Sequence, residues 1–464
     1  MQPENLYQNL VRNFEHNPTQ DQRIALKMLS SFVLSKEIKI FILKGFAGTG
    51  KTTIMRTLIE NLDLIKRKFS LLAPTGRAAK ILTKYTQKKA YTIHRKIYYS
   101  SFDDSGIFKP RLKINKNKNV VFVIDEASLI SENDSQMELF TKKSLLDDIV
   151  EHVDFNTNSK IIFLGDPAQL PPVKHAFSPA LNKAFIENKF NTEVCQNVIT
   201  NVVRQKKKSG ILQNATILRN KILGNDFDFQ FSIYDDVVYL NDGYEVQDAI
   251  QSSYEEYGLS NTIIIVRSNK RANLYNDQIR KTILSRNHKL CVGDTLMITK
   301  NNYYWLASDS EIPFLANGDI IEVLQIYYFK ELYGFEFVEA KVKMVDYDSS
   351  KVFDIIINLD SLSSDLTSLS FDQNKSLYEE VSKDYEKIKS KFLRYKKIKE
   401  NPYFNALNVK FSYSITCHKA QGGQWPVVLI EKPYLKDGFN EDNLRWLYTA
   451  VTRAEIKLYL IGFS

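Results

Sequence analysis

Short apolar runs separated by helical patterns make up the first part of the chain. The runs are IKIFILK (38–44), FSLLA (69–73), VVFVI (120–124) and KIIFLG (160–165). Continuous apolar runs of this length are typical of parallel strands that are buried on both faces. With helical stretches between them, they predict an α/β domain with a doubly wound sheet.

A second alternation begins near residue 200. TIIIV (262–266), VVLI (427–430) and KLYLIG (457–462) are predicted strands, and residues 269–284 are a predicted helix. Between them the pattern changes, from about residue 300 to 408. NGDIIEVLQIYYF, FEFVEAKVKMV and KVFDIIINL are typical of antiparallel strands. We therefore expect a small β-rich domain inserted into a second α/β domain.

Two further segments have a distinct pattern. A charged stretch carries apolar residues at spacings of three and four, which predicts one helix with a buried packing face; these residues are Tyr378, Val381, Tyr385, Ile388, Phe392 and Tyr395. Residues 96–118 interrupt the first α/β domain with a glycine, a proline and many basic residues. That composition is compatible with a small hairpin or with a solvated loop.

Composition bounds the class of protein. A chain of 464 residues is too long for one core, so two to four domains are expected. The net charge of +9 is compatible with a polyanionic partner but does not establish one. Cys195, Cys291 and Cys417 are far apart, which argues against a disulfide framework. With neither a signal peptide nor a membrane-spanning run in the sequence, we expect a cytoplasmic protein.

The stretch GFAGTGKTT (45–53) follows a predicted strand and opens a predicted helix. It fits the phosphate-binding P-loop, in which backbone N–H groups and the helix N-terminus surround phosphates. Lys51 would contact the β- and γ-phosphates, and the Thr52 hydroxyl would bind Mg²⁺. The candidate ATP-binding residues here are Gly45, Gly48, Thr49, Gly50, Lys51, Thr52 and Thr53.

Two carboxylates stand at the end of another buried strand, in VVFVIDEAS (120–128). Asp125 would hold Mg²⁺ through water, and Glu126 would polarise the attacking water as a general base. The alternative is that both acids cap the next helix. With the P-loop upstream, the pair favours an NTPase that hydrolyses its nucleotide.

The remaining motifs resemble those of superfamily 1 helicases. GDPAQLPPV (165–173) is similar to motif III, in which Gln169 would contact the γ-phosphate. The resemblance gives Gln22 the adenine-reading role of the Q motif, and makes Arg204 and Arg453 the two arginine fingers. Other stretches in family order are APTGRAAK (73–80, motif Ia), TIHRKI (92–97, motif Ib), NVVRQ (201–205) and LYTAVTRA (447–454, motif VI).

The residues of these motifs most closely resemble those of superfamily 1B, the RecD-like and Dda-like DNA helicases. The resemblance extends from Gln22 to Arg453. The resemblance implies two RecA-like cores, a β-hairpin pin, an SH3-like insertion and 5′→3′ movement. On this basis the first core is 1–88 and 119–199, the pin 89–118, the second core 200–299 and 409–464, and the SH3-like insertion with a helical arm 300–408.

The resemblance also implies a track for single-stranded DNA. Its candidate contacts are Pro74, Thr75, Thr92, His94, Thr416 and His418. At the pin, Phe108 is the preferred tip residue, with Phe102 as the alternative. The threonines would otherwise be helix caps, and the histidines structural.

The stretch SITCHKAQGGQW (414–425) resembles motif V. Alone, its Cys417 and His418 are compatible with a metal site or a thiol nucleophile. As motif V, Gly422 and Gln424 lie on the nucleotide side, and Cys417 is a buried spacer.

The leading hypothesis is therefore an ATP- and Mg²⁺-dependent 5′→3′ DNA helicase. We expect a monomer that binds single-stranded DNA and the junction between single and double strands, with no membrane partner. The alternatives are a translocase that displaces bound proteins, an RNA-directed helicase, or an NTP-gated nucleic-acid-binding subunit with little turnover.

Overall fold

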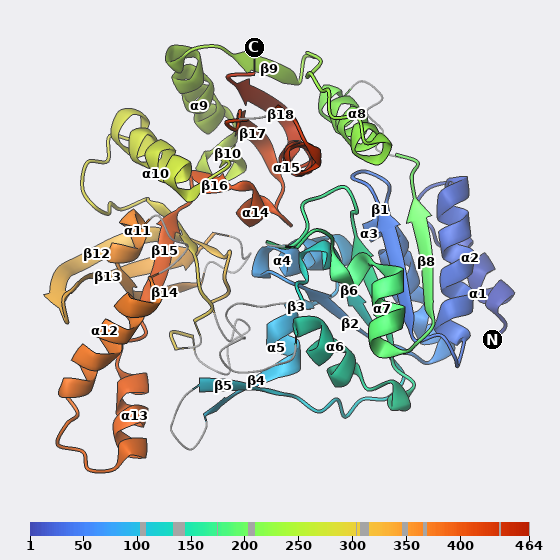
Figure 1. Cartoon of the computed structure of the whole chain (residues 1–464), viewed down its shortest axis with the longest axis horizontal. Helices are drawn as coiled ribbons and strands as arrows, with labels where there is room; N and C mark the ends of the chain where they lie inside the picture. Colours follow the sequence, from blue (N-terminus) through green and yellow to red (C-terminus); the bar gives the residue numbers. More distant parts are fainter. Residues whose placement is uncertain are drawn as a thin grey trace. The chain divides into compact units, whose positions relative to one another are not determined.

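The computed structural model describes the chain except for 103–107, 133–143, 174, 203–208, 303, 307–314, 346–350, 365–368, 436–437 and 464. Side chains are also left undescribed at 100–102, 108–110 and 371. The chain divides into two compact units (Figure 1). The first unit comprises Met1–Ser101, Lys109–Phe229 and Phe439–Thr452, and the second comprises Phe102–Phe108, Gln230–Gly438 and Arg453–Ser464.

The first unit is built on a parallel sheet of six strands in the order β3-β2-β6-β7-β1-β8. Its strands are β1 (Ile40–Gly45), β2 (Lys68–Ala73), β3 (Ala90–Thr92), β6 (Val120–Ile124), β7 (Lys160–Gly165) and β8 (Val194–Ile199). The four predicted strands are confirmed. The sequence pattern missed β3, which has three residues, and β8, whose apolar run is interrupted by Gln196 and Asn197.

Helices cover both faces of this sheet, as the predicted doubly wound arrangement requires. Alternate residues of β1 enter different cores: Phe41 and Leu43 pack with α1, α2 and α3, whereas Ile40 and Ile42 pack with α5, α6 and α7. The helices of this unit are α1 (Pro3–Arg12), α2 (Gln20–Leu34), α3 (Lys51–Asn61), α4 (Gly76–Thr86), α5 (Ile93–Ile97), α6 (Leu145–Val153), α7 (Lys183–Phe190), α8 (Gly210–Gly224) and α15 (Glu441–Val451).

The interruption after α5 contains a hairpin rather than a wholly irregular loop. Strands β4 (Tyr98–Phe102) and β5 (Phe108–Leu112) pair as a two-stranded sheet. The hairpin begins directly after α5 and, past β5, returns to that helix: the Lys113 N–H donates to the Ile97 carbonyl at 2.6 Å.

The second unit has a smaller parallel sheet in the order β16-β10-β17-β18-β9. Its strands are β9 (Val237–Leu240), β10 (Thr262–Val266), β16 (Ser414–Thr416), β17 (Trp425–Glu431) and β18 (Ala454–Ile461). The helices beside it are α9 (Gly243–Tyr257), α10 (Asn269–Gln278) and α14 (Cys417–Ala420). The predicted helix over 269–284 is therefore α10, continued by a π-helical turn over Ile279–Ile283.

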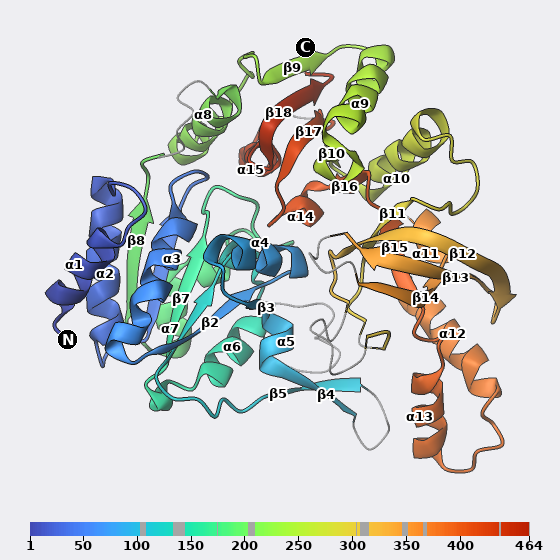
Figure 2. The same cartoon turned by 180° about the vertical axis from the view of Figure 1, so that it is seen from behind.

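A closed five-stranded barrel interrupts this sheet in the sequence and confirms the predicted β-rich insertion (Figure 2). Pairing is antiparallel except between β14 and β15, which are parallel. The strands are β11 (Thr295–Ile298), β12 (Ile320–Leu332), β13 (Phe335–Met344), β14 (Val352–Asn358) and β15 (Leu407–Phe411), and the short helix α11 (Asp360–Ser363) follows β14.

The prediction of one charged helix with a continuous buried face is wrong. The segment forms two helices, α12 (Phe371–Lys383) and α13 (Lys391–Glu400). The Ser390 hydroxyl caps α13, and the Arg394 guanidinium donates to the Ile388 carbonyl in the connecting turn. Because the turn changes the helix axis, the stripe is divided: Val381 is buried, whereas Phe392 is 55% exposed. No helix in the described part of the chain combines the length and the apolar character needed to cross a membrane.

A buried carboxylate fastens the barrel to the second sheet. Asp294, which is fully buried, accepts hydrogen bonds from Arg280 at 3.1 and 3.0 Å and from Arg286 at 3.1 Å. The Tyr413 hydroxyl, between β15 and β16, donates to the same carboxylate at 2.9 Å. Asp294 therefore ties the π-helical turn to the segment in which the chain leaves the barrel.

We predict that Asp294→Ala destabilises the barrel by about 3–5 kcal/mol, since it leaves buried guanidinium groups without their counter-charge. Native-state hydrogen exchange of β11 and β15 amides measures this. The matched control is Glu336→Ala, because Glu336 pairs with Lys289 at the surface, and an exposed pair contributes less than about 1 kcal/mol. Equal effects of the two substitutions would contradict the assignment.

Candidate functional site

The P-loop connects β1 to α3 and has a backbone that glycine alone accommodates well. Gly48 and Gly50 have φ of 76° and 86°. A Cβ atom on Gly45 would lie 2.7 Å from Thr49 Oγ1 and 2.9 Å from Lys51 Cγ. These glycines let the loop turn tightly and direct its N–H groups toward one point, the arrangement that binds phosphate oxygens.

The side chains of the loop are held in place. The Lys51 ammonium donates to the Gly45 carbonyl at 2.6 Å and to the Phe46 carbonyl at 3.2 Å, so it lies over the loop. Thr49 is buried, and its hydroxyl donates to the Phe46 carbonyl. Thr52 and Thr53 are half-buried in the first turn of α3. A polyphosphate at this helix N-terminus would meet N–H groups and one ammonium together.

Gln22 packs against the loop from α2, and both ends of its amide are occupied. Its Nε2 donates to the Thr49 carbonyl at 3.0 Å, and its Oε1 accepts from the Thr19 N–H at 2.9 Å as part of a capping box. Gln22 therefore supports the P-loop in this structure. Its predicted reading of adenine stays a prediction, for which the second N–H of Nε2 and the second lone pair of Oε1 are suited.

Asp125 and Glu126 follow β6, which β7 separates from the P-loop strand β1 in the sheet. Burial raises the pKa of Asp125, opposed by a hydrogen bond from the Glu126 N–H at 2.8 Å and by the charge of Lys51. Glu126 has the left-handed conformation with φ of 50°, which costs about 1–3 kcal/mol for a residue with a side chain and is typical of functional sites. The Glu126 side chain makes no capping bond to the following turn, which disfavours the capping alternative.

The donor set here fits Mg²⁺ rather than a transition metal. A threonine hydroxyl and a carboxylate, Thr52 and Asp125, are hard oxygen ligands. Among the described residues no group of three or more His, Cys, Asp or Glu side chains is arranged to hold a metal. Magnesium at this site would therefore need phosphate oxygens and water to complete its shell.

Helix α15 connects the P-loop to the segment after β7. The Ala47 N–H donates to the Tyr448 hydroxyl at 3.0 Å, and that hydroxyl donates to Asp166 at 2.7 Å. Burial raises the pKa of Tyr448 well above its ordinary value, so the phenol stays protonated. At the next residue of α15, the Thr449 hydroxyl accepts a hydrogen bond from the Leu170 N–H at 2.9 Å.

Gln169 is enclosed by the same helix. Arg445 of α15 donates to the carbonyls of Pro167 and Gln169. The Gln169 side chain is 5% exposed, and its Oε1 has no hydrogen-bond partner among the described atoms. A buried acceptor of this kind costs free energy until a donor reaches it, so Gln169 is suited to orient a water molecule or a ligand.

In the second unit, Arg453 and the predicted motif V lie together. The Arg453 guanidinium, which is 4% exposed, donates to the Gly423 carbonyl at 3.1 Å, and the Trp425 N–H donates to the Arg453 carbonyl at 2.9 Å. Gly422 has φ of 73°, and Gln424 is half-buried beside it. Gly422, Gly423 and Gln424 lie in the loop between α14 and β17, and Arg453, which directly precedes β18, is bonded to that loop.

The structure confirms that Cys417 is a buried spacer. It is fully buried, and burial raises its pKa to about 12, which leaves the thiol protonated and unreactive. Its neighbours differ: Thr416 is half-buried and makes no capping bond, while His418 is exposed. His418 is therefore the exposed member of this stretch, and Thr416, Lys419 and Gln424 are half-buried.

The comparisons with known proteins agree with this division. Residues 18–229 match the model of an AAA domain, and residues 411–461 match the model of a UvrD-like helicase C-terminal domain. The chain is 28% identical to the ATP-dependent DNA helicase dda of Enterobacteria phage T4, over 67% of this chain and 68% of the relative. It is 25% identical to the RecBCD enzyme subunit RecD of Buchnera aphidicola, over 99% of this chain and 74% of the relative.

The chain belongs to helicase superfamily 1B, with the RecD-like and Dda-like proteins. A solved structure of Bacteroides Pif1 bound to ssDNA has the same fold, with a TM-score of 0.50, 15% identity, and coverage of 97% of this chain and 93% of that one. This likeness concerns the fold alone, which in this chain comprises two parallel sheets and the five-stranded barrel insertion.

Two threonines of the predicted DNA track are helix caps in this superfamily 1B chain. The Thr75 hydroxyl accepts from the Ala78 N–H at the start of α4, and the Thr92 hydroxyl accepts from the Arg95 N–H at the start of α5. Pro74 and His94 are half-buried, with the His94 ring 5.8 Å from that of Tyr98. Their contact with DNA stays a prediction.

Arg204 lies within 203–208, outside the described part of the chain. Phe102 in β4 and Phe108 in β5 belong to described strands, but their side chains are not described. Sequence reasoning missed Arg445, Tyr448 and Thr449. Their spacing of three and four, just before the predicted Arg453, is a signal that could have placed them on one helix face.

We predict that Tyr448→Phe lowers the turnover rate of ATP hydrolysis by about tenfold, with a smaller effect on KM. The substitution removes the acceptor of Ala47 and the donor to buried Asp166, and hydrogen bonds to charged groups contribute about 1.5–3 kcal/mol. Steady-state hydrolysis with single-stranded DNA measures it. Tyr434→Phe is the control, because Tyr434 is 92% exposed; an unchanged rate for Tyr448→Phe would exclude the coupling role.

Proposed function

We propose that this chain is an ATP-dependent DNA helicase that moves 5′→3′ on single-stranded DNA and unwinds duplex. The observation that carries the proposal is the continuous set of bonds from the P-loop through Tyr448 to Asp166 and the Gln169 loop. A phosphate-binding loop joined in this way to a second functional segment is suited to transmit hydrolysis, not only to bind nucleotide.

In the proposed reaction, each group near the P-loop has a separate task. Lys51 stabilises the charge of the transferred phosphoryl group, and Glu126 accepts a proton from the attacking water. Gln169 would contact the γ-phosphate and link hydrolysis to the nucleic-acid track. Magnesium, held by Thr52 and through water by Asp125, neutralises phosphate charge when it is bound.

Arg204 and Arg453 would complete the site as arginine fingers, which contribute about 10³–10⁵-fold to rates of this class of reaction. Gln22 would read the adenine, and Gly422 and Gln424 would contact the nucleotide from motif V. Because the fingers and the P-loop would come from different cores, hydrolysis would be coupled to closure of the two cores.

The proposed domains follow the superfamily. The first RecA-like core is 1–88 with 119–199, and the second is 200–299 with 409–464. Residues 89–118 form the pin, and 300–408 the SH3-like insertion with its helical arm. Pro74, Thr75, Thr92, His94, Thr416 and His418 would contact backbone phosphates, which fixes position without sequence preference.

The relatives support a nucleic-acid track. The phage T4 relative is named an ATP-dependent DNA helicase, and the Pif1 structure of the same fold is bound to ssDNA. We expect the same class of partner here, namely single-stranded DNA and its junction with duplex, bound by a monomer.

The deciding experiment compares partial duplexes of DNA and of RNA that carry a 5′ or a 3′ tail. We expect ATP-dependent unwinding of 5′-tailed DNA, and none by Lys51→Ala, which lacks the phosphate-binding ammonium. Preference for a 3′ tail would overturn the polarity, and preference for RNA would overturn the substrate. Turnover without strand separation would favour a translocase, and binding without turnover an NTP-gated subunit.

A second prediction concerns the β4–β5 hairpin as the pin. Phe108→Ala should abolish unwinding and preserve ATP hydrolysis stimulated by single-stranded DNA. The reason is that an aromatic tip would act on the first base pair and not on the ATP site. Phe102→Ala, from the opposite strand, is the matched variant. Equal loss of both activities in Phe108→Ala would exclude it as the tip.

A further inference from the structure

A basic pocket lies at the base of the β4–β5 hairpin, within the first unit. Its volume is about 430 Å³. Its walls come from Tyr91 and helix α5, from residues 113–117 after β5, and from His152 of α6. None of the residues assigned above to the nucleotide or to the single-strand track lines it.

Positive charge dominates the pocket. Arg95, Lys96, Lys113 and Lys116 all line it, and none of the described residues in its lining carries a carboxylate. Burial lowers the pKa of Lys96 and Lys113, and for Lys113 the charges of Lys96 and Arg95 lower it further. Like charges gathered in this way repel one another, so an anion in the pocket would relieve a cost that the fold already bears.

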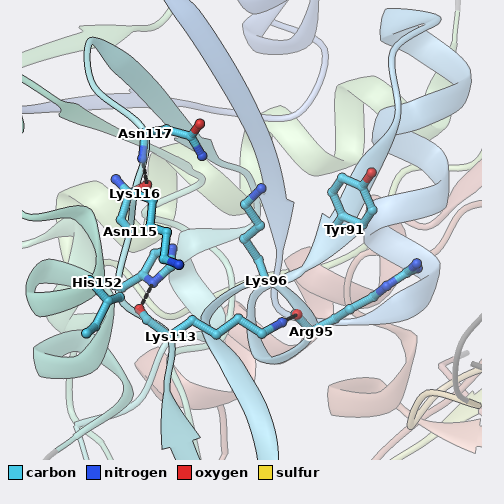
Figure 3. Close-up of a pocket in the computed structure, with 9 residues that line it drawn as sticks. Tyr91, Arg95, Lys96, Lys113, Asn115, Lys116, Asn117 and His152 are labelled. Atoms are coloured by element: carbon cyan, nitrogen blue, oxygen red, sulfur yellow. Dashed lines mark hydrogen bonds between the residues drawn. The ribbon is translucent and has the colours of Figure 1, made fainter.

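The frame of the pocket is fixed by hydrogen bonds. The Lys113 ammonium donates to the Arg95 carbonyl at 2.9 Å, and the Lys113 carbonyl lies 2.6 Å from Nδ1 of His152 (Figure 3). A carbonyl only accepts, so that ring nitrogen carries the proton. Buried Asn115 donates to the Val153 carbonyl at 3.2 Å. The 113–117 segment is therefore anchored to α5 and α6, and its cations need little ordering to bind a ligand.

An aromatic ring supports the cations on the opposite wall. The Arg95 guanidinium is 4.9 Å from the centre of the Tyr91 ring, and the Lys96 ammonium is 5.6 Å from it. Cation–π contacts of this kind hold the two side chains beside the ring, at the edge of the pocket.

We propose that this pocket binds a backbone phosphate of the DNA duplex ahead of the hairpin. The proposal rests on the proposed function, because it places the hairpin at the junction of the two strands. A strand of five residues rises about 17 Å, which corresponds to about five base-pair steps of 3.4 Å. The pocket thus holds the duplex about five base pairs from the point of separation.

The test is equilibrium binding without ATP, measured by fluorescence anisotropy with a single strand and with a fork whose stem is closed by a loop. Lys96→Ala and Lys116→Ala each remove one cation and leave the hydrogen bonds of Lys113 intact. We expect each to weaken binding of the fork and to reduce the salt slope for the fork by about 1. Binding of the single strand and DNA-stimulated ATP hydrolysis should not change.

Lys36→Ala is the control, because Lys36 is an exposed lysine outside the pocket; it should bind the fork like the wild type. A fork with a stem of only about three base pairs is a second control, since it would not reach the pocket and should not distinguish the variants. Agreement of both controls supports the assignment to duplex.

Other outcomes overturn the proposal. Equal loss of single-strand and fork binding would place the pocket on the single-strand track. Unchanged fork binding would exclude a duplex contact, and inorganic pyrophosphate that binds the wild type but not the variants, with fork binding unchanged, would indicate a free-phosphate site. Because this test needs no unwinding, failure of the proposed 5′→3′ helicase activity would not by itself produce any of these results.

Discussion

The first unit depends on one phenolic hydroxyl, that of Tyr448. It accepts from the P-loop at Ala47 and donates to Asp166, so a single oxygen atom fixes the phosphate-binding loop relative to the segment that carries Gln169. Because the three groups are buried or half-buried, none can readily exchange its partner for water. A movement of the P-loop therefore has to be accommodated by this segment or by helix α15.

A second buried polar centre has a comparable role in the other unit. Asp294 gathers Arg280, Arg286 and Tyr413, and so joins the barrel to the strand that leads into motif V. Asn276 adds a reciprocal pair with Ser414, accepting from its N–H at 2.7 Å and donating to its carbonyl at 3.1 Å. The exposed His418 is thus presented by a short stretch that is fixed at its base, which suits a contact that must be positioned rather than strong.

The charged groups around the P-loop and those of the basic pocket are arranged differently. Around the P-loop, Lys51 is bonded to two loop carbonyls and Asp125 to a backbone N–H, whereas the pocket at the base of the β4–β5 hairpin collects cations without a carboxylate among the described residues that line it. The first arrangement suits chemistry on one phosphoryl group. The second suits a backbone whose charges repeat along its length, for which attraction matters more than geometry.

The sequence by itself determined the elements whose information is local. Continuous apolar runs predicted β1, β2, β6 and β7, since a strand buried on both faces has few polar positions. The spacing of the glycines predicted the P-loop. Periodicity failed where a turn was set by side-chain bonds, as between α12 and α13. Only the tertiary structure joined Ala47 to Tyr448, 401 residues apart, and assembled the basic pocket from separate segments. The physical reason is that a local pattern reports which face of an element is buried, whereas the partners of a buried polar group are chosen by the packing of the whole unit.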